Sequence, residues 1–488
     1  MIAYAANTGT PHLSERTARK TLVRLHRTTI MEQSLSTTRL LEQHTVRNLV
    51  LRLGIPAMFG QFFNILYSIV DRIFVGRIPE TGGISLAAIG VCAPMLTAIT
   101  AFAYMVGIGG ASAMSICLGQ KNQAQARAIL GNALLLLLGI SAVVTSSLLL
   151  FQRPVLYLLG CSDAMYPYAA QYFTIYLCGT VSSLCSVGLN QFLLAQGYAK
   201  QGMISVVIGA GINLILDPIL IFGLDLGVSG AAIATVTAQT CMAVYVILQL
   251  RRRDMPVRLG LHRLQGTLCR RIITIGSMSF LITILDNLII ILLNIVLRKY
   301  GSAVQGDRLI TCATVVQSFL TIVFCPAQGI TSGCGTIFSY HYGAGNFQKI
   351  RQAFAYMFVL CALYIGLMQL SVQLFPEVFA RLFLQDSSLQ ALAASSLRLY
   401  TFALIGVAVQ YALVDGLTAM GLVRYALPLS VFRKLVYLAC IFVLPHLLDI
   451  QYLFLAGTIS DAIGASFSLL LFFSYIFPRL SRANKSAS

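Results

Sequence analysis

Long apolar segments recur along the whole chain and constrain its fold more than any other feature of the sequence. Twelve of them occur in the 488 residues, at about 49–76, 85–118, 126–152, 164–195, 201–223, 229–250, 269–298, 308–341, 350–375, 391–420, 423–446 and 451–477. Each is long enough for a helix to cross ~30 Å of hydrocarbon, which takes ~20 residues. Only 10% of the residues are charged, against about 25% in soluble proteins. The sequence therefore predicts an all-α integral membrane protein with twelve transmembrane helices.

Basic residues gather in alternate connecting segments, which predicts an orientation in the membrane. With the N-terminus placed in the cytoplasm, the cytoplasmic segments hold 24 of the 34 Lys and Arg residues and the outer segments hold eight. Such an excess is typical of cytoplasmic loops, so both termini are expected there. The net charge of +18 is explained by this topology, and we expect no nucleic-acid binding.

The chain divides into two halves around a basic stretch. Residues 251–271 carry seven arginines and one acid and fall between the sixth and seventh apolar segments. We therefore expect six-helix lobes at 46–252 and 269–478, joined by a cytoplasmic linker at 253–268. The polar residues 1–45 lack the apolar core of a signal peptide and are expected to form a disordered cytoplasmic tail. Residues 479–488 are expected to form a second tail.

Two short motifs repeat between the halves. Gly119-Gln-Lys-Asn122 matches Gly343-Ala-Gly-Asn346 at an offset of 224 residues, and Gln191–Gly197 matches Gln410–Gly416 at an offset of 219. Because each half has six spans, the halves insert in the same orientation, and the repeat axis runs along the membrane normal. Two lobes related in this way enclose a cleft that can open to either side.

Five acids fall within the predicted spans, where an ionisable residue indicates a functional site. They are Asp71, Asp217, Asp286, Asp415 and Asp461. Asp71 and Asp217 lie five and six residues before the outer ends of their spans, and Thr235 lies six residues after the start of its span. All three are therefore expected about 8–10 Å below the outer surface, on three helices of one half.

Further oxygen groups are expected beside Asp217. Asn213 lies one helical turn before it and shares its face. Pro218 has no N–H, so the Leu214 carbonyl loses its helical partner. Carboxylate, amide, hydroxyl and carbonyl oxygens suit Na⁺, and two neighbouring carboxylates can instead share a proton. Asp71, Asn213, Asp217 and Thr235 are the candidate cation site, and the coupling ion is left as Na⁺ or H⁺.

A polar stripe follows the first span and is expected to line the cleft. Gln61, Asn64 and Tyr67 share a face with Asp71. Asp286, Gln328, Asp415 and Arg433 are further candidates, and depth suggests that Arg433 pairs with Asp461. The cysteines lie mostly in apolar runs and the histidines are scattered, so we expect no disulfide framework, metal cluster or cofactor. No convergent nucleophile and base indicate an enzyme.

Several segments, in order, resemble the multidrug and toxic compound extrusion (MATE) antiporters. They are IPAMFGQFFNILYSIVDRIFVGRI, LGQKNQAQAR, NLILDPILIFGLDLGVSGAAIAT and PAQGITSGCGTIFSYHYGAGNFQKIRQA, and the resemblance covers roughly residues 46–478. It implies a V-shaped pair of six-helix lobes that exchange Na⁺ or H⁺ for cationic amphipathic drugs. In the prokaryotic branch with its cation site in the N-terminal lobe, the implicated residues correspond to Asp71, Asn213, Asp217 and Thr235. The arginine of the eleventh span corresponds to Arg433.

We therefore expect a monomeric exporter of small organic cations, in contact with lipid in the bacterial inner membrane. The first alternative is a lipid-linked saccharide flippase of the same superfamily. An anionic cargo favours a basic cavity, but the spans hold five acids and few bases, mainly Arg433 and Lys434. The second is a passive channel, which paired repeats and titratable acids fit less well than coupled exchange.

Overall fold

Helices make up nearly all of the part of the chain that this computed structural model describes, which is residues 41–42, 44–79, 81–159, 161–260, 262–300, 303–384, 386–476 and 478. Most of the two predicted tails lies outside these residues. The helices of the first half are α2 (Val46–Gly76), α3 (Gly82–Gly119), α4 (Gln123–Leu150), α5 (Gln152–Leu158), α6 (Tyr166–Cys178), α7 (Thr180–Ala195), α8 (Ala199–Pro218), the π turn η1 (Ile219–Gly223) and α9 (Gly227–Arg251).

The second half repeats this order of elements. Its helices are α10 (Gly266–Tyr300), α11 (Ala303–Gly343), α12 (Phe347–Leu374), α13 (Pro376–Phe383), α14 (Ser387–Thr401), α15 (Gly406–Ala419), α16 (Val423–Leu447), the 3₁₀ turn η2 (Ile450–Phe454), α17 (Leu455–Leu471) and the π turn η3 (Phe472–Ile476). The short helices α5 and α13 both follow the third helix of their half, and neither was expected from the sequence.

The number of spans agrees with the sequence prediction. Within the described residues, ten helices are long and apolar enough to cross a membrane, and two bent pairs bring the number to twelve. The bent pairs are α6 with α7, at 56°, and α14 with α15, at 53°. Each bent pair is the fourth span of its half, so the bend is also repeated. The expected fold of twelve membrane helices is confirmed.

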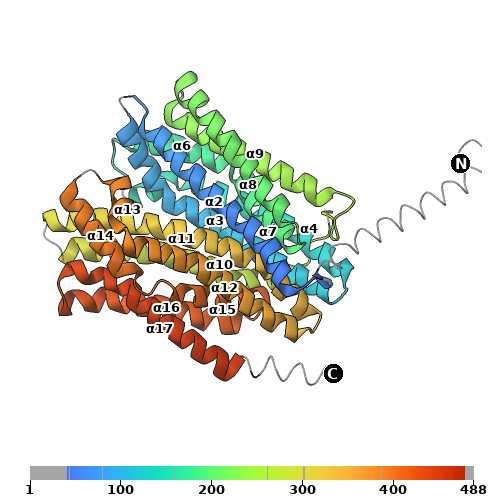
Figure 1. The fold of residues 1–488 in the computed structure, drawn as a ribbon. Coiled ribbons are helices and arrows are strands. Elements are labelled where there is room, and N and C mark those ends of the chain that lie inside the picture. The colour runs from blue at the N-terminus through green and yellow to red at the C-terminus, as the bar shows by residue number, and fades with distance from the viewer. Residues whose placement is uncertain are drawn as a thin grey trace, which may run out of the picture.

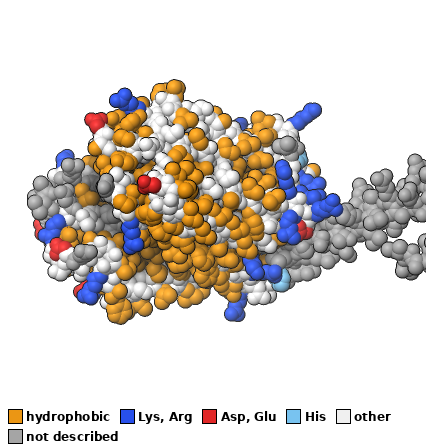
Figure 2. All heavy atoms as spheres, turned by 90° about the horizontal axis from the view of Figure 1, so that it is seen from above, with side chains coloured by type: hydrophobic (Ala, Val, Ile, Leu, Met, Phe, Trp, Pro, Cys, Tyr) orange, Lys and Arg blue, Asp and Glu red, His pale blue; other side chains and the backbone are white. Residues whose placement is uncertain are grey.

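The helices form two lobes. Figure 1 shows α2–α9 on one side and α12–α17 on the other, with α10 and α11 between them. Apolar side chains cover the middle of the molecule, and most charged side chains gather at its two ends (Figure 2). This distribution is the one that a bilayer requires, because a charge in the hydrocarbon is costly.

The repeated motif at offset 224 is a helix cap. The Asn122 side chain accepts a hydrogen bond from the backbone of Gln125 at the start of α4, and Asn346 does the same for Lys349 at the start of α12. The residue before each asparagine has a left-handed backbone, with φ 60° at Lys121 and 70° at Gly345. Side-chain capping satisfies a backbone donor that the first helical turn leaves free, which explains why the motif occurs in both halves.

The offset of 219 predicted for the second motif is wrong. Gly197 and Gly421 both have a left-handed backbone, with φ 85° and 73°, and each ends the bent fourth span. These positions are 224 residues apart, not 219. The hydrogen bond from Ser115 to the Ala195 carbonyl has its counterpart in the bond from Ser339 to the Ala419 carbonyl. One offset of 224 therefore relates the helices α3–α8 to α11–α16.

Glycines bring the two lobes into backbone contact at one end of the molecule. A Cβ at Gly109 of α3 would overlap the Ile272 carbonyl oxygen of α10, and a Cβ at Gly333 of α11 would overlap the Leu53 carbonyl oxygen of α2. Gly109 and Gly333 are again 224 residues apart. These contacts lie in the halves of the helices that adjoin the basic connections near residues 120, 260 and 346, so the lobes meet at the basic end.

Candidate cation and substrate sites

Asp71 and Asp217 come together in the interior of the first lobe. Asp71 lies near the end of α2 and Asp217 near the end of α8, and the two helices pack closely against each other. Their carboxyl groups are close enough for a side-chain hydrogen bond when one of them holds a proton. Asp71 is 9% exposed and Asp217 is fully buried. Asn213, also buried, donates a hydrogen bond of 3.0 Å from Nδ2 to Oδ1 of Asp217.

Each carboxylate keeps one oxygen without a partner. Oδ1 of Asp71 and Oδ2 of Asp217 are both buried and accept no hydrogen bond. A buried unsatisfied carboxylate oxygen is costly, and a cation or proton removes that cost. The pair can therefore hold a small cation between two oxygens or share a proton. This chemistry follows from the donor set alone. The structure brings Asp71, Asn213 and Asp217 together, and cation binding by them stays a prediction.

Thr235 and Pro218 lie in the same part of the lobe. Thr235 is buried on α9, a helix that packs against α8 and also touches α2. Pro218 ends α8, and the chain continues directly into the π turn η1, where the Leu224 amide bonds to the Ile219 carbonyl at 2.9 Å. π turns widen the backbone ladder and occur often at functional sites. The free Leu214 carbonyl stays a prediction.

Tyrosines surround the acid pair, and the sequence indicated only one of them. Tyr67 on α2 interacts electrostatically with both acids, and also with Tyr104 on α3 and Tyr176 on α6. Tyr172 lies next to Asp71 on the α6 side. Tyr172 and Tyr176 are four residues apart on one helical face, with their rings stacked at 6.4 Å. That spacing was visible in the sequence, but apolar spans contain many aromatic residues, so it did not mark these two.

The second lobe does not repeat this site. At an offset of 224, Asn213 corresponds to Tyr437 and Asp217 to Ile441. Both counterparts are buried on α16. An aromatic ring and a branched apolar chain replace the amide and the carboxylate, so a small cation finds no equivalent pair of oxygens there.

The second lobe holds a different set of charges. Arg433 on α16 donates to Asp461 on α17 at 2.9 Å, which confirms the pairing suggested by depth. Asp461 retains one buried oxygen without a partner. Asp415 on α15 accepts a hydrogen bond of 2.5 Å from Thr331 on α11. Arg433 and Asp415 therefore both have partners inside their own lobe.

Asp286 also has a basic partner, which the sequence did not indicate. Lys434 on α16 donates to the Asp286 carboxylate on α10 and, at 3.3 Å, to the Ile282 carbonyl one turn earlier. The Lys434 side chain is 3% exposed, whereas the Asp286 side chain is 52% exposed. The ammonium is thus enclosed by protein, and one side of the carboxylate remains open.

Polar residues continue from the first lobe toward the second. Gln61 lies near Tyr104 of α3, and Tyr104 lies near Cys325 of α11. Tyr411 of α15 lies near Cys325, and it also neighbours Asp286 and Asp415. Asn64 and Gln328, also expected to line the cleft, are half-buried on α2 and α11. The candidate substrate residues are thereby linked from one lobe to the other.

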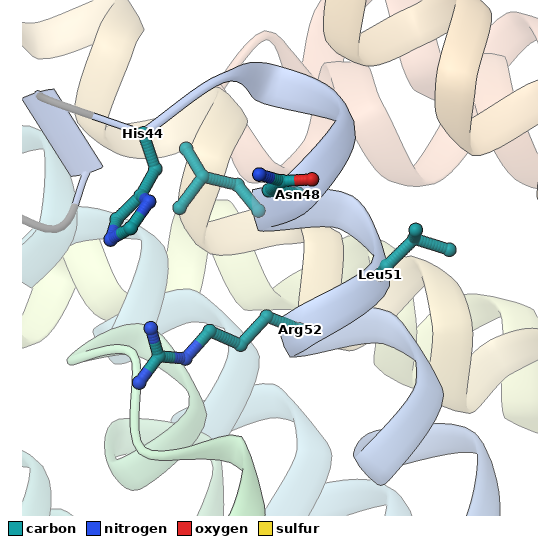
Figure 3. A pocket seen from close by; sticks show the side chains of 5 residues that line it. His44, Asn48, Leu51 and Arg52 are labelled. Carbon is teal, nitrogen blue, oxygen red and sulfur yellow. The ribbon is translucent and has the colours of Figure 1, made fainter.

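A surface pocket lies far from these groups, at the basic end. It has a volume of about 430 Å³ and is lined by His44, Asn48, Leu49, Leu51 and Arg52. The side chains of His44 and Arg52 extend from the start of α2 on one side of the helix (Figure 3). Arg52 precedes Asp71 by 19 residues, or roughly 28 Å of helix. This pocket is therefore separate from the acid pair.

The segment before α2 is bound to the opposite lobe beside this pocket. Tyr340 on α11 donates a hydrogen bond of 2.9 Å to the Glu42 carboxylate. Lys349 on α12 donates to the backbone carbonyls of Glu42 and Leu41, at 2.6 and 3.3 Å. Leu41 itself is 2% exposed. These contacts tie the start of the first lobe to the second lobe at the end where the glycines also meet.

Comparisons with known proteins agree with this architecture. The family model MatE matches residues 56–219 and 282–443, more than half of the chain. The multidrug export protein MepA of Staphylococcus haemolyticus is 23% identical over 435 residues, which cover 89% of this chain and 94% of that protein. A solved outward-facing structure of a multidrug resistance MATE family transporter of the MOP superfamily has a TM-score of 0.84 at 22% identity and covers 91% of this chain and 98% of that one.

A second solved structure is equally similar in fold. It is a MOP superfamily transporter from Pyrococcus furiosus for which a reverse polarity of the binding pocket is described, with a TM-score of 0.84 at 23% identity, covering 91% of this chain and 98% of that one. At such identities the solved structures show the fold alone, whereas the match to the family model shows the family. The chain is a multi-pass membrane protein that belongs to the MatE family of transporters.

Proposed function

We propose that this protein is a secondary antiporter that exports small cationic amphipathic compounds in exchange for Na⁺ or H⁺ bound by Asp71 and Asp217. The observation that carries the proposal is the pair of buried carboxyl groups, each with an oxygen that has no partner. The similarity to MepA, a multidrug export protein, supports the cargo class. No resident cofactor is needed, because the ion gradient supplies the free energy.

The helix α2 offers a route from ion binding to lobe movement. It packs against α8 at the acid pair and against α11 of the other lobe along its first half. Neutralising Asp71 and Asp217 removes the repulsion between two carboxylates in a low-dielectric interior. The end of α2 can then pack more tightly against α8, and its contact with α11 changes with it. Rocking of the two lobes gives alternating access to the cleft.

The membrane orientation belongs to the same proposal. The basic end, where the lobes meet, is placed in the cytoplasm of a bacterium, with the protein in its inner membrane as a monomer among lipids. In this orientation the lobes are closed toward the cytoplasm. This is the state in which an exporter releases cargo outward and receives its coupling ion from outside.

The charge of the second lobe favours this function over flipping of a lipid-linked saccharide. An anionic cargo needs basic groups that are free to bind it. Arg433 and Lys434, the two bases beside Asp286 in this lobe, are both paired with acids. The cleft therefore offers no uncompensated basic charge from these residues, and an organic cation is the better cargo.

The test is efflux of a fluorescent organic cation from vesicles under separately imposed Na⁺ and H⁺ gradients. Asp71→Asn is expected to abolish the acceleration that the effective gradient produces. Asp225→Asn is the matched control, because Asp225 is an exposed acid in the nearby connection after η1. Full gradient-dependent efflux by Asp71→Asn contradicts the proposal.

A further inference from the structure

The Lys434–Asp286 pair differs from an ordinary buried ion pair, because its two members have unequal access to water. The ammonium is enclosed, with two oxygen partners, whereas half of the carboxylate side chain is exposed. A ligand can therefore reach Asp286 without first displacing any other part of the protein. Only the bond to Lys434 competes with it.

Asp286 lies on the side of α10 that packs into the protein. On an ideal helix, Asp286 lies within about 20° of Ile275 and of Leu293, eleven residues before and seven after. Both of these residues are buried, at 7% and 2% exposure. The exposed apolar residues Leu281, Leu288 and Ile295 form a separate stripe at roughly 140° or more from Asp286, and Ile290, 36% exposed, lies between the two faces at about 40° from Asp286. Asp286 therefore lies on the side of α10 that carries its buried residues.

The helix that carries Asp286 also contacts the other lobe. Phe280, on α10 as well, packs against Phe102 of α3 with a centroid distance of 4.8 Å. Tyr411, an electrostatic neighbour of Asp286, packs against Phe324 of α11 at 6.1 Å. Aromatic rings beside a reachable carboxylate form the type of surface that an amphipathic organic cation binds.

The two ion pairs around Asp286 are balanced in charge without a ligand. Arg433 and Lys434 supply two positive charges, and Asp461 and Asp286 supply two negative ones. Arg433 also acts electrostatically on Asp286. A cationic ligand that binds the carboxylate must therefore weaken the bond to Lys434, and the ammonium becomes a competitor fixed to the protein.

We propose that Lys434 is a tethered counter-cation that competes with the organic cation for Asp286 and thereby keeps cargo affinity low enough for release. This proposal rests on the export function above and concerns cargo affinity, not ion coupling. Asp286 binds the positive charge of a monovalent cargo, and the lysine returns to it when the cargo leaves. Lys434 thus determines affinity without itself binding the cargo.

The test is equilibrium binding of tetraphenylphosphonium and of ethidium to the purified full-length protein, without any ion gradient. Lys434→Met is expected to bind both cations at least about tenfold more tightly, because the carboxylate loses its internal partner. Lys434→Arg keeps the positive charge and is expected to bind within about threefold of the wild type. Lys299→Met, which removes the same charge at the end of α10, is the control for net charge.

A double variant separates the pair from other effects of the substitutions. In the Asp286→Asn background, replacing Lys434 by Met is expected to leave cation affinity unchanged, because the two residues act on the same ligand contact. Thermal unfolding of every variant shows whether the fold is kept. Asp286→Asn alone is expected to unfold at a lower temperature, since it leaves an enclosed ammonium unpaired.

The outcome for this proposal can be told apart from that for the export function. Lys434→Met that is folded but binds the cations no more tightly than the wild type overturns the proposal, even where the wild type exports them. Equal tightening in the control Lys299→Met also overturns it. If the wild type does not export the cations but Lys434→Met binds them more tightly, the role of Lys434 is supported and the proposed export function is overturned.

Discussion

Asn213 holds one oxygen of Asp217 through a hydrogen bond of 3.0 Å across a single turn of α8. This bond fixes the carboxylate and leaves its second oxygen, which has no partner, for a ligand on the Asp71 side. The amide therefore orients the acid, much as an outer residue orients a metal ligand. The proposed cation site is thus partly ordered before any ion binds.

Removing that amide is expected to weaken ion binding more than it weakens the fold. Asn213→Ala should raise the ion concentration needed for half-maximal efflux by about 10–100-fold, the usual effect of losing an orienting partner. Titration of vesicle efflux against the coupling ion measures this shift. Thr240→Ala, on the exposed side of α9, should leave the titration unchanged. An unchanged titration in Asn213→Ala would show that Asp217 binds without this orientation.

A methyl group at Gly276 is expected to separate the lobes. Its Cβ would overlap the carbonyl oxygen of Met105 on α3, a backbone atom that cannot rotate away. Overpacking of this kind costs about 1–3 kcal/mol, so Gly276→Ala should unfold at a lower temperature in detergent. Gly139→Ala in α4 is the control, because a Cβ there meets nothing within 4 Å and should be neutral or stabilising. Equal effects of the two changes would contradict this description of the contact.

Loss of the Tyr340 hydroxyl is expected to loosen the closed basic end. Tyr340→Phe removes the hydrogen bond to Glu42, worth about 1 kcal/mol, which corresponds to a roughly fivefold change in the open population. Cys334 on α11 reports it, because its Sγ lies against Gly54 of α2. In a variant that keeps only this cysteine, its maleimide labelling should accelerate about fivefold by the same estimate. Tyr342→Phe is the control, and no acceleration over it would show that Glu42 does not hold the lobes together.

Separating Arg433 from Asp461 is expected to destabilise the second lobe strongly. Arg433→Met leaves a carboxylate that is 2% exposed without its cation, which costs about 3–5 kcal/mol. The control is Arg381→Ala, which breaks a pair with Glu377 in which both side chains are about two-thirds exposed. An exposed pair of this kind contributes only about 0–1 kcal/mol to stability. Denaturant unfolding in detergent compares the two variants. A small effect at Arg433 would mean that water reaches Asp461.

The spans and the acid pair could be predicted because strong physical constraints act on them within short segments. The thickness of the bilayer sets the length of each apolar run, and the position of an acid along its run sets its depth. Asp71 and Asp217 could thus be placed at one level. Asn213 could be assigned to Asp217 because a helix brings residues four apart onto one face.

Contacts between distant segments could not be predicted in the same way. Which faces of α10 and α16 meet depends on the packing of whole helices, so the sequence showed Lys434 and Asp286 but not their bond. Residue identities favour the offset of 219, because both motifs begin with Gln and end with Gly. The backbone at Gly197 and Gly421 shows the correct register, and a backbone angle is not visible in residue identities alone.

The shared offset of the lobe-contact glycines has a consequence for how the duplicated chain can change. Gly109 and Gly333 each support the opposite copy, so a larger side chain at either would tilt one half against the other. Positions that contact only their own half, such as Asp217 and its counterpart Ile441, are not constrained by the contact between the halves. The two halves must therefore keep the same small residues where each packs against the other, and their sequences can diverge elsewhere.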